Sequence, residues 1–277
     1  MKSSKFVIII ALILAVTVPA GAQQSSPFSV ESTAAVLLDY DSGQILFSQN
    51  GDTEHIPASL VKVMTMYVAF DQIAAGQVSL QDTTTVSEQA WRMTGSQMFL
   101  EVGEVVTIEQ LLYGIAVVSG NDACVALAEA LAGYVRWMNE KASKLGLNLH
   151  FTDVHGLSDS NTITAKDMAF LVRSYLQDHP EALQYHKERT FAYQPRSQKQ
   201  PIVQHNRNGL LNSFEGADGL KTGHLKAAGY NLIGTAVQNN RRLIAVVLGA
   251  QSEREREQEA AKLLNYGYRS FNLVDST

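Results

Sequence analysis

The spacing of hydrophobic and polar residues changes along the chain and separates two strand-forming ends from a helical middle. Short apolar runs bounded by turn residues predict strands, and apolar residues repeating every three or four positions predict helices. The predicted strands are residues 34–39, 44–48, 219–222, 230–237 and 242–248. The predicted helices are residues 59–75, 107–118, 122–133, 135–145, 164–177 and 253–268. This order is typical of an α+β fold, with a helical insert at about residues 77–215.

Local signals set several boundaries of these elements. Thr107 and Gln110 have the spacing of a capping box, which opens a helix. Gly76 ends the helix before it, and residues 77–106 are expected to be irregular with short strands. Asn239 and Asn240 predict a tight turn between the last two strands. A functional site is expected in the cleft between the strand-forming and helical parts.

The N-terminus has the pattern of a secretory signal peptide. Lys2 and Lys5 precede an apolar run at residues 6–18, and small residues follow up to Ala22. A membrane anchor is the alternative, but the run is shorter than the roughly 20 residues that a spanning helix needs. We expect cleavage after Ala22 and an exported mature domain at residues 23–277. No later stretch is apolar enough to suggest a membrane anchor.

Composition narrows the functional classes. The formal net charge is −5, which gives no basis for a nucleic-acid partner. The only cysteine, Cys124, cannot form an internal disulfide and lies in an apolar helical run, so we interpret it as a buried structural thiol. His150 and His155 have no convincing third ligand, so we do not interpret them as a metal site.

Ser59 and Lys62 form the first motif that can carry chemistry. Residues three apart on a helix share a face, at about 5–6 Å between Cβ atoms. A serine hydroxyl becomes a nucleophile when a base removes its proton, and a lysine held neutral by burial can be that base. Alone the pair is a weak signal, because a solvated helix face shows the same spacing.

Two further motifs follow in the sequence. Ser119 and Asn121 interrupt two apolar helical segments, where they are either a plain turn with a helix cap or a proton relay and a substrate-binding amide. Lys221, Thr222 and Gly223 lie on a predicted strand, where a lysine and a hydroxyl can bind a carboxylate and glycine lets a substrate approach the backbone. The alternative is an ordinary exposed strand end.

All three motifs in this order, behind a signal peptide, are the set described for penicillin-binding proteins and class A β-lactamases. The chain resembles the low-molecular-mass penicillin-binding proteins of the D-alanyl-D-alanine carboxypeptidase family over nearly all of residues 29–270. The stretches that carry the resemblance are PASLVK (57–62), SGNDAC (119–124), HGL (155–157), AKDM (165–168), NRNGLL (206–211), DGLKTGH (218–224), AGYN (228–231) and Arg256.

The resemblance implies the β-lactamase/DD-peptidase (transpeptidase-like) fold, an antiparallel sheet flanked by helices with an all-helical subdomain. It also implies a serine-type carboxypeptidase that removes the terminal D-alanine of peptidoglycan stem peptides through an acyl-enzyme, and that β-lactams acylate. No metal or other cofactor is implied. The catalytic residues carried over are Ser59 as nucleophile, Lys62 as general base and Ser119 as proton relay. The substrate-binding residues carried over are Asn121, Lys221, Thr222, Gly223, His224 and Arg256, with an oxyanion hole at the N–H groups of Ser59 and His224.

Three departures from the family pattern stand out. Leu225 occupies a position where the family usually has threonine, which is expected to affect substrate preference. The stretch after Gly133 is shorter than usual. The family member that the resemblance points to continues into a β-rich domain and a terminal amphipathic membrane helix. We expect this chain to lack both, as a soluble periplasmic enzyme or a shortened form of a longer protein.

Three alternatives to a carboxypeptidase stay open. A D,D-endopeptidase would use the same site on cross-linked stem peptides. A class A β-lactamase would need a Glu-x-x-x-Asn element for deacylation, and we find no convincing one between Asn121 and Lys221. A non-catalytic peptidoglycan-binding protein would keep the fold without the nucleophile, and the presence of Ser59 and Lys62 argues against it.

Overall fold

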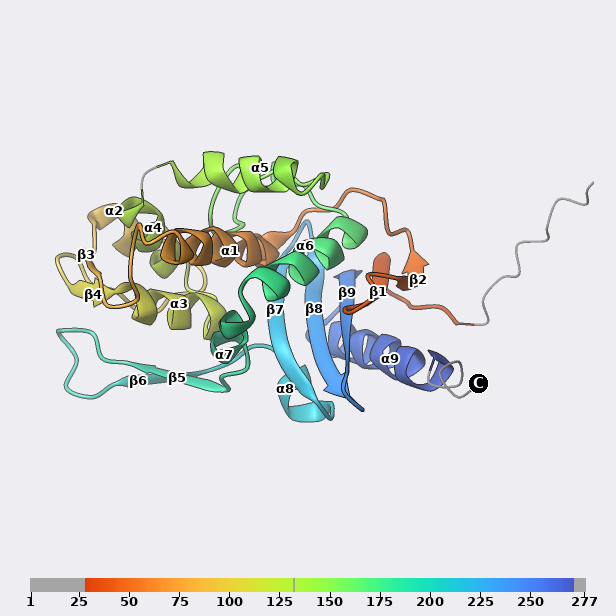
Figure 1. Ribbon diagram of the computed structural model, residues 1–277. Coiled ribbons are helices and arrows are strands. Elements are labelled where there is room, and N and C mark those ends of the chain that lie inside the picture. Colours follow the sequence, from red (N-terminus) through yellow and green to blue (C-terminus); the bar gives the residue numbers. More distant parts are fainter. Residues whose placement is uncertain (1–27, 132, 272–277) are drawn as a thin grey trace, which may run out of the picture.

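The computed structural model describes residues 28–131 and 133–271, and the predicted signal peptide lies outside them. In this part of the chain a five-stranded antiparallel sheet has the order β2-β1-β9-β8-β7 (Figure 1). The strands are β1 (Ala34–Asp39), β2 (Ile45–Gln49), β7 (Ala217–Leu225), β8 (Gly229–Gln238) and β9 (Arg241–Ala250). The first and last parts of the chain therefore form one sheet, as the sequence predicts.

Helices cover both faces of this sheet. Helix α9 (Glu253–Phe271) packs on one face and α6 (Ala165–Asp178) on the other (Figure 1). Successive residues of β1 point to opposite faces, so Val36 and Leu38 enter the larger apolar core on the α6 side while Ala35 and Leu37 enter the smaller core on the α9 side. Coverage on both sides explains why every residue of β1 is buried.

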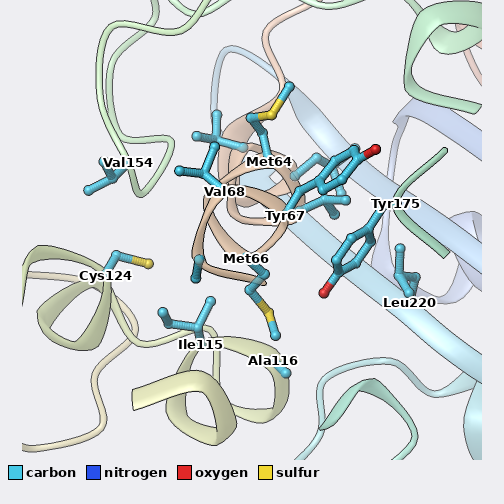
Figure 2. Close-up of a cluster of buried hydrophobic side chains, with 14 of the residues drawn as sticks. Met64, Met66, Tyr67, Val68, Ile115, Ala116, Cys124, Val154, Tyr175 and Leu220 are labelled. Atoms are coloured by element: carbon cyan, nitrogen blue, oxygen red, sulfur yellow. The ribbon is translucent and has the colours of Figure 1, made fainter. Parts of the chain in front are cut away.

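The helical part is built around α1 (Val61–Ala74). The first ten residues of α1 are buried, which is the property of a helix enclosed on all sides. Figure 2 shows its side chains surrounded by residues of other helices, the 152–161 loop and β7. The remaining helical elements are η1 (Ala58–Leu60), α2 (Glu88–Trp91), α3 (Ile108–Val117), α4 (Asn121–Ala130), α5 (Tyr134–Lys144), η2 (Pro180–Ala182), α7 (Leu183–His186) and α8 (Leu210–Ser213).

Two short hairpins accompany these helices. Strand β3 (Thr83–Thr85) pairs with β4 (Val105–Thr107), within the segment predicted to contain short strands. Strand β5 (Thr190–Tyr193) pairs with β6 (Ile202–His205), a hairpin that the sequence analysis did not predict. The predicted fold class, an antiparallel sheet flanked by helices with a helical subdomain, is confirmed.

Several predicted boundaries are confirmed by hydrogen bonds or backbone angles. Thr107 and Gln110 form the capping box at the start of α3. Gly76 follows α1 with a φ of 68°, the left-handed conformation that ends helices. Asn239 and Asn240 also have positive φ values and join β8 to β9, as a two-residue hairpin turn requires. The described residues contain no helix long and apolar enough to cross a membrane.

Candidate active site

Ser59 lies in the 3₁₀ turn η1, just before α1, where two glycines approach its backbone. A Cβ atom on Gly156 would lie 1.9 Å from the carbonyl oxygen of Ala58 and 3.0 Å from the Ser59 nitrogen. A Cβ atom on Gly223 would lie 3.1 Å from the same nitrogen. The 152–161 loop and strand β7 therefore reach Ser59 because each has a glycine at the contact.

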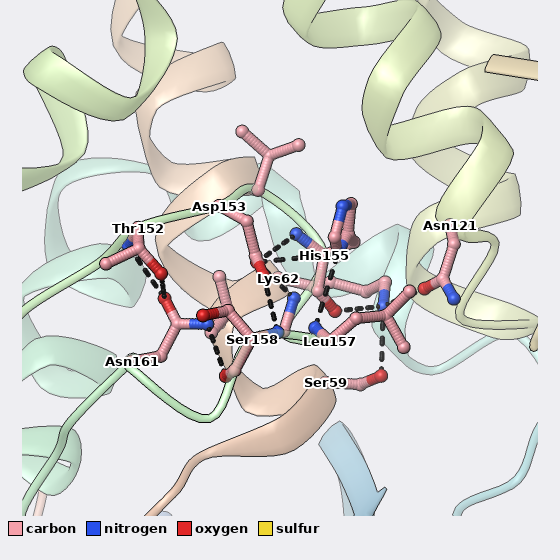
Figure 3. Close-up of polar contacts among 12 residues, drawn as sticks. Ser59, Lys62, Asn121, Thr152, Asp153, His155, Leu157, Ser158 and Asn161 are labelled. Carbon is pink, nitrogen blue, oxygen red and sulfur yellow. Dashed lines mark hydrogen bonds and ion pairs between the residues drawn. The ribbon is translucent and has the colours of Figure 1, made fainter. Parts of the chain in front are cut away.

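Lys62 points its ammonium at the Ser59 hydroxyl. Its Nζ lies 2.9 Å from Ser59 Oγ, 2.7 Å from Asn121 Oδ1 and 2.6 Å from the carbonyl oxygen of His155 (Figure 3). The side chain is fully buried, and burial lowers the pKa of Lys62 although the carboxylates of Asp153 and Asp122 act in the opposite direction. A lysine with a lowered pKa is better able to accept a proton from serine.

The His155 carbonyl is held in place by the 152–161 loop. The Asp153 carboxylate accepts hydrogen bonds from the backbone N–H groups of His155 (3.0 Å), Gly156 (2.5 Å) and Ser158 (2.8 Å) (Figure 3). Asn161, which is buried, accepts from Thr152 N–H at 2.8 Å and donates to the Ser158 carbonyl at 3.0 Å. Burial opposes ionisation of Asp153, but these backbone donors outweigh it and its pKa is lowered.

The second predicted motif lies opposite Ser59, between α3 and α4. Ser119 is 3% exposed and has a φ of 61°, an uncommon conformation for a residue other than glycine. Asn121 accepts from Lys62 through Oδ1, and its amide nitrogen donates to the Thr94 carbonyl at 2.6 Å. Since an amide nitrogen carries two hydrogens, Asn121 has a second one to offer a substrate carbonyl.

The Asp122 side chain holds the backbone of residues 98–100 against this motif. Its buried carboxylate accepts from the backbone N–H groups of Met98, Phe99 and Leu100 at 2.8–3.1 Å. Burial raises the pKa of Asp122, and these donors act in the opposite direction. Gly95, in the preceding residues of the same loop, lies beside the Asn121 amide, where a Cβ atom on Gly95 would lie 3.0 Å from Nδ2.

The third predicted motif lies on β7, the edge strand of the main sheet. Lys221 Nζ donates to Ser119 Oγ and to the Thr222 carbonyl, both at 2.9 Å. Lys221 is 3% exposed, and burial together with the nearby Lys62 lowers its pKa well below the usual lysine value. Two buried lysines thus contact two serine hydroxyls, Lys62 with Ser59 and Lys221 with Ser119.

A cavity of about 320 Å³ opens where the three motifs meet. Its wall contains most of the site residues predicted from the sequence. They are Ser59, Ser119, Asn121, Thr222, Gly223, His224 and Arg256. Lys62 and Lys221 lie behind the wall and reach it through their contacts with Ser59 and Ser119. The structure thus brings the predicted residues together.

Arg207, Arg256 and Glu253 line one end of the cavity, and the Glu253 carboxylate lies 3.6 Å from Arg256 Nη2. Arg256 is 2% exposed, its guanidinium lies 5.7 Å from the centre of the Tyr230 ring, and its Nε is buried without a hydrogen-bond partner in the described chain. The imidazole ring of His224 stacks on the same Tyr230 ring, at 4.0 Å between the two ring centroids. An unpartnered buried guanidinium N–H beside a cavity fits an anionic ligand such as a carboxylate.

Sequence reasoning missed other residues of this site. Arg207, Leu157, Gly95 and Ser96 also line the cavity, and of these Arg207 and Leu157 lie within stretches that carried the family resemblance. The His155 carbonyl was missed because a backbone acceptor has no residue-type signal. The backbone N–H groups of His155 and Gly156 are fixed by their hydrogen bonds to the Asp153 carboxylate.

Cys124 has no role in the contacts described so far. Cys124 is fully buried, and burial raises the pKa of its thiol to about 12, in keeping with the predicted structural role. In residues 28–131 and 133–271 no group of three or more His, Cys, Asp or Glu side chains is placed to hold a metal ion.

Comparisons with known proteins show the family of the chain. Residues 20–252 match the family model described as D-alanyl-D-alanine carboxypeptidase. The chain is 43% identical over 259 residues to D-alanyl-D-alanine carboxypeptidase DacC of Escherichia coli, covering 89% of this chain and 63% of that protein. The chain thus spans less than two thirds of the length of this relative.

Solved structures show the same similarity. Penicillin-binding protein 5 of Haemophilus influenzae superposes with a TM-score of 0.83 and 39% identity, covering 88% of this chain and 72% of that chain. A penicillin-binding protein of Listeria monocytogenes in the ampicillin-bound form superposes with a TM-score of 0.77 and 27% identity, covering 87% of this chain and 98% of that chain.

Proposed function

The chain belongs to the D-alanyl-D-alanine carboxypeptidase family, and on this premise we propose that it removes the terminal D-alanine from peptidoglycan stem peptides through an acyl-enzyme on Ser59. The observation that carries the proposal is the contact of 2.9 Å between Ser59 Oγ and the fully buried Lys62 Nζ, whose pKa is lowered. A nucleophile within hydrogen-bonding distance of a base of adjusted pKa is the arrangement that covalent catalysis requires.

Acylation begins when Ser59 Oγ attacks the carbonyl carbon of the penultimate D-alanine and its proton passes to Lys62. The N–H groups of Ser59 and His224 would hold the resulting oxyanion, and donors of this kind contribute on the order of 10²–10³ in rate each. Collapse of the tetrahedral intermediate breaks the peptide bond. The leaving D-alanine amine takes a proton from Ser119, and Lys221 resupplies Ser119 at 2.9 Å. The proton that Lys62 took from Ser59 then passes to Lys221, which leaves Lys62 neutral again before deacylation.

Deacylation is hydrolysis of the ester by water. Water attacks the acyl carbon and loses a proton to the neutral Lys62. The ester bond to Ser59 Oγ then breaks, Lys62 returns this proton to Ser59 Oγ, and the shortened peptide is released. A β-lactam carries a reactive amide and a carboxylate, and we propose that it acylates Ser59 in the same way and is released slowly. The ampicillin-bound relative supports this part of the proposal.

The substrate would bind along the open edge of β7. Backbone groups of an edge strand pair with an extended peptide, and Thr222 and His224 line the cavity there. Arg256, with the side chains of Lys221 and Thr222, would attract the terminal carboxylate, and Asn121 would donate its amide to the peptide. The N-terminal pattern at residues 1–22 supports a periplasmic location, where such peptides are found.

Intact-mass spectrometry after incubation with a penicillin tests the nucleophile. We expect a mass gain of one drug molecule in the natural protein and none in Ser59→Ala, with both proteins folded by circular dichroism. D-Alanine release from a pentapeptide then tests the reaction. No adduct on folded protein would favour a non-catalytic binding protein, and rapid appearance of hydrolysed penicillin would favour a β-lactamase.

A further inference from the structure

The end of the cavity that would receive the substrate's terminal carboxylate already contains a carboxylate. Two arginines, Arg207 and Arg256, line this end, and Glu253 is the one acidic side chain among the described residues of the cavity wall. Glu253 Oε1 lies 3.6 Å from Arg256 Nη2, which is an ion pair but longer than a hydrogen bond. An anion of the protein therefore lies beside the cation that we assign to the substrate.

Arg256 needs a counterion because its guanidinium is buried. The side chain is 2% exposed, Nη2 donates to the Arg207 carbonyl at 3.3 Å, and Nε has no hydrogen-bond partner in the described chain. Burial lowers the pKa of Arg256, and the carboxylates of Glu253 and Glu257 act in the opposite direction. Since a buried charge without compensation is costly, these two carboxylates stabilise the charged arginine in the free enzyme.

The two carboxylates differ in how easily they can move away. Glu257 accepts a hydrogen bond from the Gly209 N–H at 3.2 Å and does not line the cavity. Glu253 is 70% exposed, and its ion pair with the arginine is its one polar contact within residues 28–131 and 133–271. The start of α9 does not depend on it, because Ser252 Oγ accepts from the Glu255 N–H at 3.1 Å. Glu253 can therefore turn into water at little cost.

A substrate carboxylate and the Glu253 carboxylate would compete for one guanidinium. They carry the same charge, so the substrate binds best when Glu253 has moved away from Arg256. The substrate also has Lys221 and Thr222 as proposed partners, so it displaces the weaker contact. Exposed ion pairs are weak, and this competition should therefore reduce the affinity for the substrate by a factor of about two to five.

We propose that Glu253 is an internal competitor for Arg256 and that the terminal carboxylate of the substrate displaces it on binding. The proposal rests on the carboxypeptidase function proposed above. It makes Glu253 a specificity-determining residue, which acts on the leaving group and not on the acyl part of the substrate. Removing its charge should strengthen the binding of compounds whose leaving group carries a carboxylate, and of no others.

Two thiolesters that differ in one charge test this assignment. N-benzoyl-D-alanyl thioglycolate has a carboxylate on its leaving group, and the methyl ester of that carboxylate is the neutral partner. Hydrolysis of either compound releases a thiol that a coloured disulfide reagent detects, and Cys124 does not interfere because it is fully buried. The values of kcat and KM are measured for the natural enzyme and for variants that circular dichroism shows to be folded.

The natural enzyme should have a lower KM for the acid than for the methyl ester. We expect Glu253→Gln to lower the KM for the acid by a further factor of about two to five, with kcat and the KM for the methyl ester unchanged. Arg256→Gln should abolish the preference for the acid. In the double variant the Glu253→Gln change should have no further effect, because the group for which Glu253 competes is absent.

Glu255→Gln is the matched control. It removes the same charge from the same turn of α9, but Glu255 does not line the cavity. Its KM values for both compounds should be those of the natural enzyme. The control separates competition at Arg256 from the general effect of one fewer negative charge at the start of the helix.

The outcomes separate this proposal from the proposed function. A folded natural enzyme that hydrolyses neither thiolester contradicts the carboxypeptidase function, and the role of Glu253 with it. Equal KM values for the acid and the methyl ester in the natural enzyme leave the function intact and overturn the competition at Arg256. A KM for the acid that does not fall in Glu253→Gln, that falls together with the KM for the methyl ester, or that falls equally in Glu255→Gln also overturns it.

Discussion

At the scale of single residues, the neighbours of Lys62 determine what its amine can do. In the described part of the chain, Nζ contacts the Asn121 and His155 oxygens, which only accept, and the Ser59 hydroxyl, which also donates. A neutral amine has two N–H groups and one lone pair. If the N–H groups go to the two carbonyl oxygens, the lone pair faces Ser59. The surroundings thus orient the base as well as lower its pKa.

Lys62→Arg tests whether a neutral base is required. Arginine keeps the positive charge and cannot be deprotonated, so we expect acylation by penicillin to fall by about 10²–10⁴. In the natural enzyme, burial lowers the Lys62 pKa, so the acylation rate should rise with pH along a limb below the usual lysine pKa of 10.5. Stopped-flow acylation rates at several pH values measure both effects. An arginine variant that acylates at the natural rate would exclude Lys62 as the base.

The sequence predicts the site residues whose role depends on side-chain type. Ser59, Lys62, Ser119 and Lys221 could be found because their order along the chain is informative even though each motif is common. The His155 carbonyl could not, because every residue has one and only the folded loop selects it.

At the scale of elements, the 152–161 loop determines where Ser59 lies. Gly156→Ala places a Cβ 1.9 Å from the Ala58 oxygen at a φ of 87°, so η1 must shift. Gly146→Ala is the matched control, since φ is 70° there and no heavy atom lies within 4 Å of the new Cβ. We expect the control to lose only the roughly 1–2 kcal/mol cost of a left-handed alanine. Gly156→Ala should lose more stability and also penicillin acylation.

Denaturant unfolding and acylation rates, measured on both alanine variants, distinguish the two effects. Equal stability losses, with acylation retained in both variants, would show that the contact between Gly156 and Ala58 does not position Ser59.

Asp153 is the side chain that shapes the same loop. In Asp153→Asn an amide replaces one carboxylate oxygen, so fewer of the N–H groups of His155, Gly156 and Ser158 keep an acceptor. We expect kcat for D-alanine release to fall by about tenfold, because Lys62 loses its ordered carbonyl partner. Asp159→Asn makes the same chemical change at an exposed position of the loop and should behave like the natural enzyme. Identical kcat values in the two variants would contradict this role.

Elements with strong local signals were predicted well. The start of α3 follows from Thr107 and Gln110, whose capping bonds need no tertiary contact. The β5–β6 hairpin was missed because tertiary contacts hold it: the Tyr193 hydroxyl donates to Glu104 at 2.9 Å, and Gln204 donates to the Gln97 carbonyl at 3.1 Å. Such long-range bonds leave no periodic signal in residues 190–205.

At the scale of the whole molecule, the site combines groups from both halves of the fold. The nucleophile and its base begin the central helix, while Lys221 and His224 come from the edge of a sheet formed mainly by the C-terminal part of the chain. Burial between these halves disfavours the charged forms of Lys62, Lys221 and His186 and lowers the pKa of each. The resulting cost should appear as a dependence of stability on pH.

The lowered pKa of His186 predicts a measurable dependence of the unfolding free energy on pH. Its pKa is lowered by burial from 6.5 to about 3, so the unfolded chain binds a proton below pH 6.5 that the folded protein does not bind. The free energy of unfolding should therefore fall as the pH drops from 6.5 toward 3, by up to about 1.4 kcal/mol per pH unit from this group. His186→Asn cannot titrate, whereas all other titrating groups are shared. Urea unfolding at pH 7, 5.5 and 4.5 should give a shallower pH dependence for the variant, and parallel curves would show that His186 is protonated in the folded protein.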